Sequence, residues 1–159
     1  MTIKNQNTII LVLCYLVVFF LVLYNINNSF FWDTVVYGSN HSSFYWSTQF
    51  SNLLLPDNMD CGVIPAFGMY IALIWEIFGR SIQTSHLAML PFALGIVYQL
   101  YILSKKFIKP EFAGITSLLV LADPTILSQV TLVSPDVPLV FFFLLGTNSL
   151  IENKKAILT

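Results

Sequence analysis

Charged side chains are scarce in this chain of 159 residues, and their scarcity excludes several kinds of protein. Only 9% of the residues are charged, whereas 57% are hydrophobic. A soluble domain is about one-quarter charged, so this composition indicates an integral membrane protein. The net charge of −1 comes without any basic patch, which excludes an electrostatic surface for nucleic acid.

Cysteine and known catalytic motifs are sparse as well. Cys14 lies in an apolar run and Cys61 in a polar loop, and neither has the spacing of a metal ligand. The chain contains no nucleophile elbow, no phosphate-binding glycine loop and no zinc pattern. Any chemistry therefore depends on where single polar side chains are placed.

Long apolar runs predict an all-α integral membrane fold with about four transmembrane helices. The first run, 8–24, follows Lys4 and has no small-residue cleavage site behind it. We interpret it as a retained span and not as a signal peptide. Three further spans are predicted at 86–104, 112–130 and 137–152.

The segment 63–79 is apolar enough to cross the membrane, and the basic residues decide its placement. If it lies along the surface, six of the seven basic residues fall on one side and only Arg80 on the other. If it crosses, the cluster at 105–109 moves outside, against the positive-inside rule. We therefore predict an outer loop at 25–85 with two interfacial helices, at about 34–50 and 63–79, and a cytoplasmic N-terminus.

The same topology gathers most acidic residues at the outer face. These are Asp33, Asp57, Asp60, Glu76, Asp123 and Asp136. Asp33 is the only charged residue between Phe30 and Pro56, a stretch rich in aromatic residues. A carboxylate among apolar side chains is costly, and it can bind a cation, relay protons or act as a general base. Asp123, which precedes a proline, is explained equally well as a helix cap.

The order of these elements resembles the GT-C superfamily of membrane glycosyltransferases, in particular its protein mannosyltransferase-like and lipid A aminoarabinose transferase-like branch. The segments that carry the resemblance are Trp32-Asp33, Val63-Ile64-Pro65, Phe78-Gly79-Arg80-Ser81 and Ser134-Pro135-Asp136-Val137-Pro138. The resemblance covers nearly all of this chain but only the first third of a typical member. We therefore expect 1–159 to be a single N-terminal membrane domain of a larger protein. Many relatives have His or Lys where this chain has Ile64, so contacts to a donor phosphate are not assigned here.

The resemblance implies a glycosyltransferase that moves a sugar from a polyprenyl-phosphate donor to an acceptor hydroxyl at the outer membrane face. Asp33 would be the general base, and Asp136 would orient the acceptor or Asp33, or bind a metal. The aromatic and basic residues of the outer loop would contact the substrate: Trp32, Tyr37, Trp46 and Arg80. The acceptor would be a lipid, a glycan or a protein, and the other partners are membrane lipids but not nucleic acid. A divalent metal ion is allowed but not required, and a bacterial inner or plasma membrane is the expected location.

Two other classes of protein remain as alternatives. A polytopic transporter or flippase-like module would use the acidic residues to relay ions, although such sites usually lie near the bilayer midplane. A structural membrane subunit anchored by its interfacial helices would need no chemistry. Further spans and a basic outer loop beyond residue 159 would favour the transferase, whereas an inverted repeat would favour transport.

Overall fold

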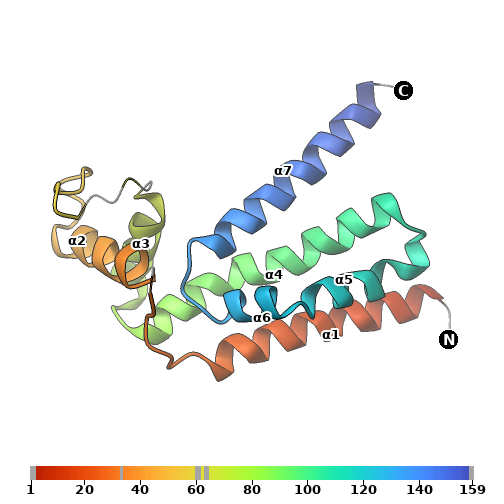
Figure 1. The fold of residues 1–159 in the computed structure, drawn as a ribbon, viewed down its shortest axis with the longest axis horizontal. Coiled ribbons are helices and arrows are strands. Elements are labelled where there is room, and N and C mark those ends of the chain that lie inside the picture. Colours follow the sequence, from red (N-terminus) through yellow and green to blue (C-terminus); the bar gives the residue numbers. More distant parts are fainter. Residues whose placement is uncertain (1–2, 33, 60–61, 63–64, 158–159) are drawn as a thin grey trace.

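The computed structural model describes residues 3–32, 34–59, 62 and 65–157, which form helices with no strand among them (Figure 1). The long helices form one bundle: α1 (Ile3–Tyr24), α4 (Ile82–Phe107), α5 (Ala113–Leu121), α6 (Pro124–Val130) and α7 (Asp136–Ile157). A short 3-10 turn, η2 (Pro110–Phe112), leads into α5. Three further helices make up what we call the surface unit: the π-helix η1 (Thr34–Asn40), α2 (His41–Ser47) and α3 (Ala66–Phe78).

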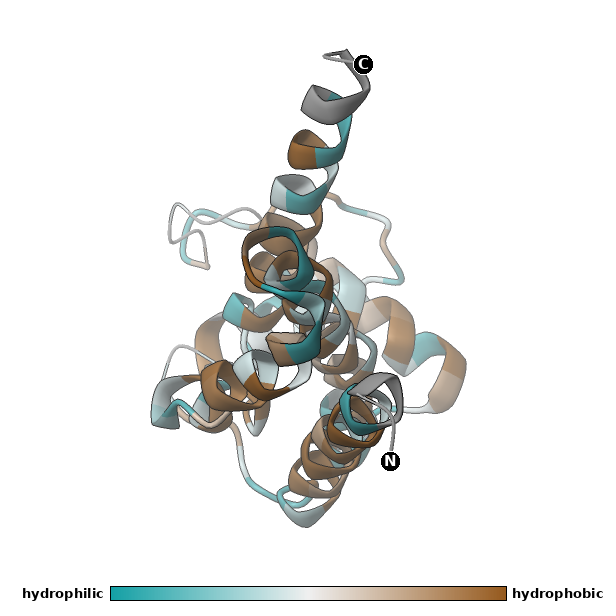
Figure 2. Ribbon diagram, turned by 90° about the vertical axis from the view of Figure 1, so that its right-hand side faces the viewer, coloured by the Kyte–Doolittle hydropathy of each residue, from teal (hydrophilic) through white to brown (hydrophobic). Residues whose placement is uncertain are grey.

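Two of these helices are long and apolar enough to cross a membrane, Gln6–Tyr24 and Ile82–Phe107. A third is added if Pro110–Leu121 and Pro124–Val130 count as one span, although they are bent by 72°. α7 is not among them, because polar residues follow its apolar first half. Figure 2 shows the contrast between the brown helix that starts at N and the mixed colours near C. The all-helical fold is thus confirmed for the described residues, with two or three helices long and apolar enough to span a membrane, while the count of four spans, including the one at 137–152, stays a prediction.

Within the predicted interfacial segment 63–79, the helix α3 extends from Ala66 to Phe78. Its 13 residues extend about 20 Å, which is shorter than the hydrocarbon core of about 30 Å. In Figure 1, α3 runs across one end of the bundle and not along it. The other predicted helix, 34–50, is divided into η1 and α2 and ends at Ser47. Placement of either helix at a membrane surface stays a prediction.

Small residues allow the bundle helices to approach closely. In a lipid environment, where the solvent is as apolar as the side chains, such close packing contacts are what hold helices together. A Cβ atom on Gly95 of α4 would lie 2.5 Å from the Phe141 ring of α7. One on Gly114 of α5 would lie 2.8 Å from Asn7 Oδ1 of α1. The interior of the bundle is filled by apolar residues such as Val18.

Polar contacts define two ends of the bundle. At one end, which we call the basic end, Asn7 Nδ2 donates to Pro110 O over 2.6 Å, and Lys105 and Lys106 occupy the last turn of α4. At the other, the loop end, His86 Nε2 lies 3.0 Å from the carbonyl oxygen of Asn28. Asn7 therefore lies at the same end of the bundle as the basic cluster at 105–109. The predicted topology likewise puts the N-terminus and this cluster on one side of the membrane.

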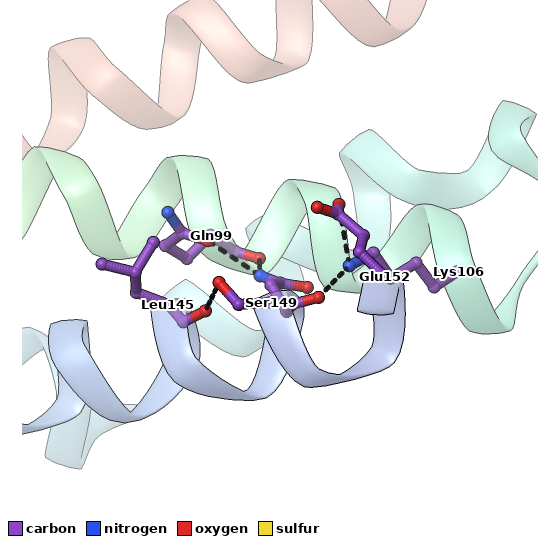
Figure 3. A network of polar contacts seen from close by, with 6 residues as sticks. Gln99, Lys106, Leu145, Ser149 and Glu152 are labelled. Carbon is purple, nitrogen blue, oxygen red and sulfur yellow. Dashed lines mark hydrogen bonds and ion pairs between the residues drawn. The ribbon is translucent and has the colours of Figure 1, made fainter. Parts of the chain in front are cut away.

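A buried polar network fastens α7 to α4 near the basic end (Figure 3). Asn148 Nδ2 donates to Gln99 Oε1 over 2.8 Å, and Lys106 Nζ donates to Asn148 O over the same distance. Lys106 also pairs with Glu152 at 3.1 Å. Because α7 is one continuous helix, this attachment helps to determine where its first residue, Asp136, lies at the loop end.

Candidate active site at the loop end

Asp33 lies outside the described residues, but the residues on both sides of it are described. Thr34 is buried, and its Oγ1 accepts from Phe31 N and donates to Phe31 O, each over 2.6 Å. Trp32 is 77% exposed and has a φ of 49°, in the left-handed region. Phe31 and Thr34 are thus joined by hydrogen bonds, and the Trp32 side chain is exposed.

The helix η1, which begins at Thr34, lies close to the turn before α7. Gly38 of η1 approaches the turn before α7 so closely that a Cβ atom there would lie 3.3 Å from Val133 O. Phe30 packs against the buried cluster that contains Val133. Gly38 is thus held against the turn before α7, while Phe30 packs on the same buried cluster. The distance between the two carboxylates stays a prediction.

Asp136 is the first residue of α7, where a negative charge is favoured by the helix dipole. Its backbone N–H is directed at Ser134 Oγ, 3.2 Å away. The side chain is exposed and forms no ion pair with any described residue. It borders a cavity of about 120 Å³ together with Gln129, whose Oε1 is buried without a hydrogen-bond partner among the described residues. A carboxylate in this position is free to accept a hydrogen bond from a bound molecule.

Asp123 has a structural role. It is the N-cap of α6, where its side chain accepts from Thr125 N over 2.8 Å and Pro124 occupies the first turn. This is the helix-cap alternative of the sequence analysis. No group of three His, Cys, Asp or Glu among the described residues could hold a metal ion. The divalent metal stays a prediction.

Arg80 lies between two tryptophans where the surface unit joins α4. Its guanidinium carbon is 5.1 Å from the ring centroid of Trp46 and also 5.1 Å from that of Trp75. Its Nη2 donates to Ser43 Oγ over 2.8 Å. Trp75 Nε1 in turn donates to Ser85 Oγ of α4 over 2.8 Å. Arg80 and Trp46 thus belong to a clamp at the C-terminal end of α3, whereas α7 begins near its N-terminal end. For Tyr37, only the backbone belongs to the described part.

The clamp leads to a prediction about Arg80. We expect Arg80→Gln to loosen α2 from α3, because two cation–π contacts of about 0.5–1 kcal/mol each are lost. Acrylamide should then quench the fluorescence of Trp46 and Trp75 more strongly. The nearby Glu76→Gln replacement changes an exposed carboxylate and should leave quenching unaltered. Equal quenching in both variants would show that the stacking contributes nothing.

Two apolar grooves lie beneath α3. The α3–α4 groove, of about 450 Å³, is lined by Tyr70, Ile74, Phe78, Thr84, Leu87 and Pro91. The α3–α7 groove, of about 340 Å³, is lined by Ala66, Tyr70, Phe92, Pro135, Pro138 and Phe142. The second groove therefore begins at the two prolines that flank Asp136. Sequence reasoning missed it because its walls come from three helices that are far apart in the chain, and no local pattern marks them.

No protein-family model, curated protein or solved structure matches this chain.

Proposed function

We propose that this chain is part of a membrane glycosyltransferase of the GT-C type, which uses a polyprenyl-phosphate sugar as donor at the outer face of the membrane. The observation that supports the proposal is the close approach of Gly38 to Val133 in the turn before Asp136, beside an apolar groove. Such an enzyme must bind the polar sugar phosphate of its donor and the hydrocarbon chain of the same donor next to each other. The loop end offers an exposed carboxylate and an apolar groove within a few residues of each other.

In the proposed reaction, Asp33 accepts the proton of the acceptor hydroxyl as its oxygen attacks the anomeric carbon of the donor. The bond from that carbon to the phosphate oxygen breaks, and polyprenyl phosphate leaves with the electron pair. Asp136 holds the acceptor or Asp33 in position. The proposal includes four membrane spans in a bacterial inner or plasma membrane. The basic end of the bundle faces the cytoplasm. Trp32 is exposed and available to contact a sugar, whereas Arg80 and Trp46 would contribute only from the clamp.

One observation favours the transporter alternative. α5 and α6 form a broken helix with a 72° bend, and transporters often bind their substrates at such breaks. Here, however, the Asp123 carboxylate at the break is occupied as the cap of α6. Measurement of ion flux in sealed vesicles separates the two candidates, because the transferase needs no ion gradient.

Replacement of Asp136 by Asn tests the proposal. We expect transfer by the full-length protein in proteoliposomes to fall about 10²-fold, because the acceptor or the base loses its orientation. Asp123→Asn is the matched control, because Asp123 is also an exposed carboxylate at the start of a helix: it weakens a helix cap by at most about 1 kcal/mol and should leave transfer unchanged. If both variants transfer at the wild-type rate, Asp136 has no part in the reaction.

A further inference from the structure

A surface that combines charge with exposed rings lies at the basic end, where α4 leads into α5. In Figure 1 this α4–α5 turn, residues 105–112, lies at the same end of the bundle as the N-terminus. Two large aromatic side chains of the turn are exposed, Phe107 by 74% and Phe112 by 54%. Lys105 and Lys109 of the same segment are exposed as well. One short segment thus presents both apolar rings and positive charge.

The three lysines of the turn have different surroundings. The side chain of Lys106 is only 11% exposed and pairs with Glu152 of α7, so its charge is compensated within the bundle. Lys105 Nζ lies 5.3 Å from the ring centroid of Tyr101, one turn earlier on α4, and forms no ion pair with any described residue. Lys109 likewise has no ion pair within the described part of the chain. Two ammonium groups are therefore available to attract an anion from outside the bundle.

Hydrogen bonds hold the backbone of the turn in place. The buried Asn7 of α1 donates from Nδ2 to Pro110 O over 2.6 Å, and its Oδ1 accepts from Gly114 N over 3.1 Å. Within the turn, Phe112 N donates to Lys109 O over 2.9 Å. A ligand would therefore meet lysines and rings on a backbone that is already ordered, and binding would cost little conformational entropy.

We propose that the α4–α5 turn binds the headgroup phosphate of an acidic phospholipid, with its two exposed lysines at the phosphate and its two exposed rings in the hydrocarbon just below. Aromatic rings favour the boundary between headgroups and acyl chains, and lysines there attract acidic lipids. A free phosphate would leave both rings in water. The 26 residues of α4 extend about 39 Å, more than the hydrocarbon core of about 30 Å. If α4 spans a membrane, its last turn therefore lies at a headgroup layer in either orientation.

The test uses native mass spectrometry to count the phospholipids bound to the full-length protein. The protein is titrated in detergent with phosphatidylglycerol or with phosphatidylcholine of the same acyl chains. We expect the wild type to bind phosphatidylglycerol about 25-fold more tightly, since each lysine beside an acidic headgroup contributes about fivefold. Replacement of both Lys105 and Lys109 by Gln should remove this preference. Replacement of both by Arg keeps the charges and should preserve it.

Three single variants test the rings and the remaining charge. Phe107→Ser should weaken the binding of both lipids, whereas Leu119→Ser, at a 68% exposed position of α5 outside the turn, should not. Glu111→Gln removes the one acid of the turn and should strengthen the binding of phosphatidylglycerol. A preference that survives in the double Gln variant overturns the assignment, and so does displacement of the lipid by inorganic phosphate. The assay involves no sugar transfer, so its outcome is independent of the proposed function.

Discussion

Replacement of Asp33 by Asn is expected to lower glycosyl transfer by the full-length protein about 10²- to 10⁴-fold, the usual contribution of a general base. Asn has nearly the same size as Asp but cannot accept the proton of the acceptor hydroxyl. Insertion and folding should be unaffected, because the turn at this position is held by Thr34 and Phe31. The measurement is the initial rate with saturating donor in proteoliposomes.

The control for Asp33 is another acid of the outer loop. Asp57 is exposed in a turn, and Asp57→Asn should transfer at the wild-type rate. A gel-filtration profile identical to that of the wild type confirms that each variant is folded. An unchanged rate of transfer by Asp33→Asn would show that Asp33 is not the general base. The proposed site would then have no residue in that role.

Replacement of Gly68 by Ala should strongly destabilise the surface unit. A Cβ atom at this position would lie 2.5 Å from His41 Cβ and 3.2 Å from the His41 carbonyl carbon, so α2 would have to move away from α3. Overpacking of this kind costs about 1–3 kcal/mol. Thermal unfolding in detergent should show a lower melting temperature, and transfer should fall because η1 is displaced with α2.

Gly146 provides the matched control for Gly68. It also lies within a helix, α7, but a Cβ atom there would meet nothing within 4 Å. Gly146→Ala should therefore be neutral or stabilising, because alanine favours the helix by up to about 1 kcal/mol. If the two variants have the same melting temperature, the close packing of α2 on α3 does not matter for stability.

The bundle could be predicted from sequence because long apolar runs bounded by basic residues define membrane helices almost by composition alone. The predicted span 86–104 is a helix from Ile82 to Phe107, and the predicted span 112–130 is bent by 72° between Leu121 and Pro124. The ends differed because capping, as at Ser81, extends a helix beyond its apolar core. Polar residues such as Asn148 lower the apolar character of the predicted span 137–152, and their hydrogen-bond partners lie on another helix.

The candidate site was only partly accessible to sequence reasoning. Single acids could be selected, because a lone carboxylate among aromatic residues is unusual. The role of Arg80 could not be foreseen, since its clamp joins residues 43, 46 and 75, which no spacing relates. The two grooves beneath α3 depend likewise on how that helix crosses the bundle. Such features arise from the packing of separate helices and have no local signature.

The most direct measurement is transfer of a labelled sugar from polyprenyl phosphate by the wild-type, full-length protein in sealed proteoliposomes. The donor and an acceptor mixture of lipid, glycan and peptide are supplied to one face at a time. Our account predicts labelled product and free polyprenyl phosphate only when the donor reaches the loop end of the bundle. Absence of transfer from either face by folded protein, together with ion flux across the vesicle membrane, would contradict it.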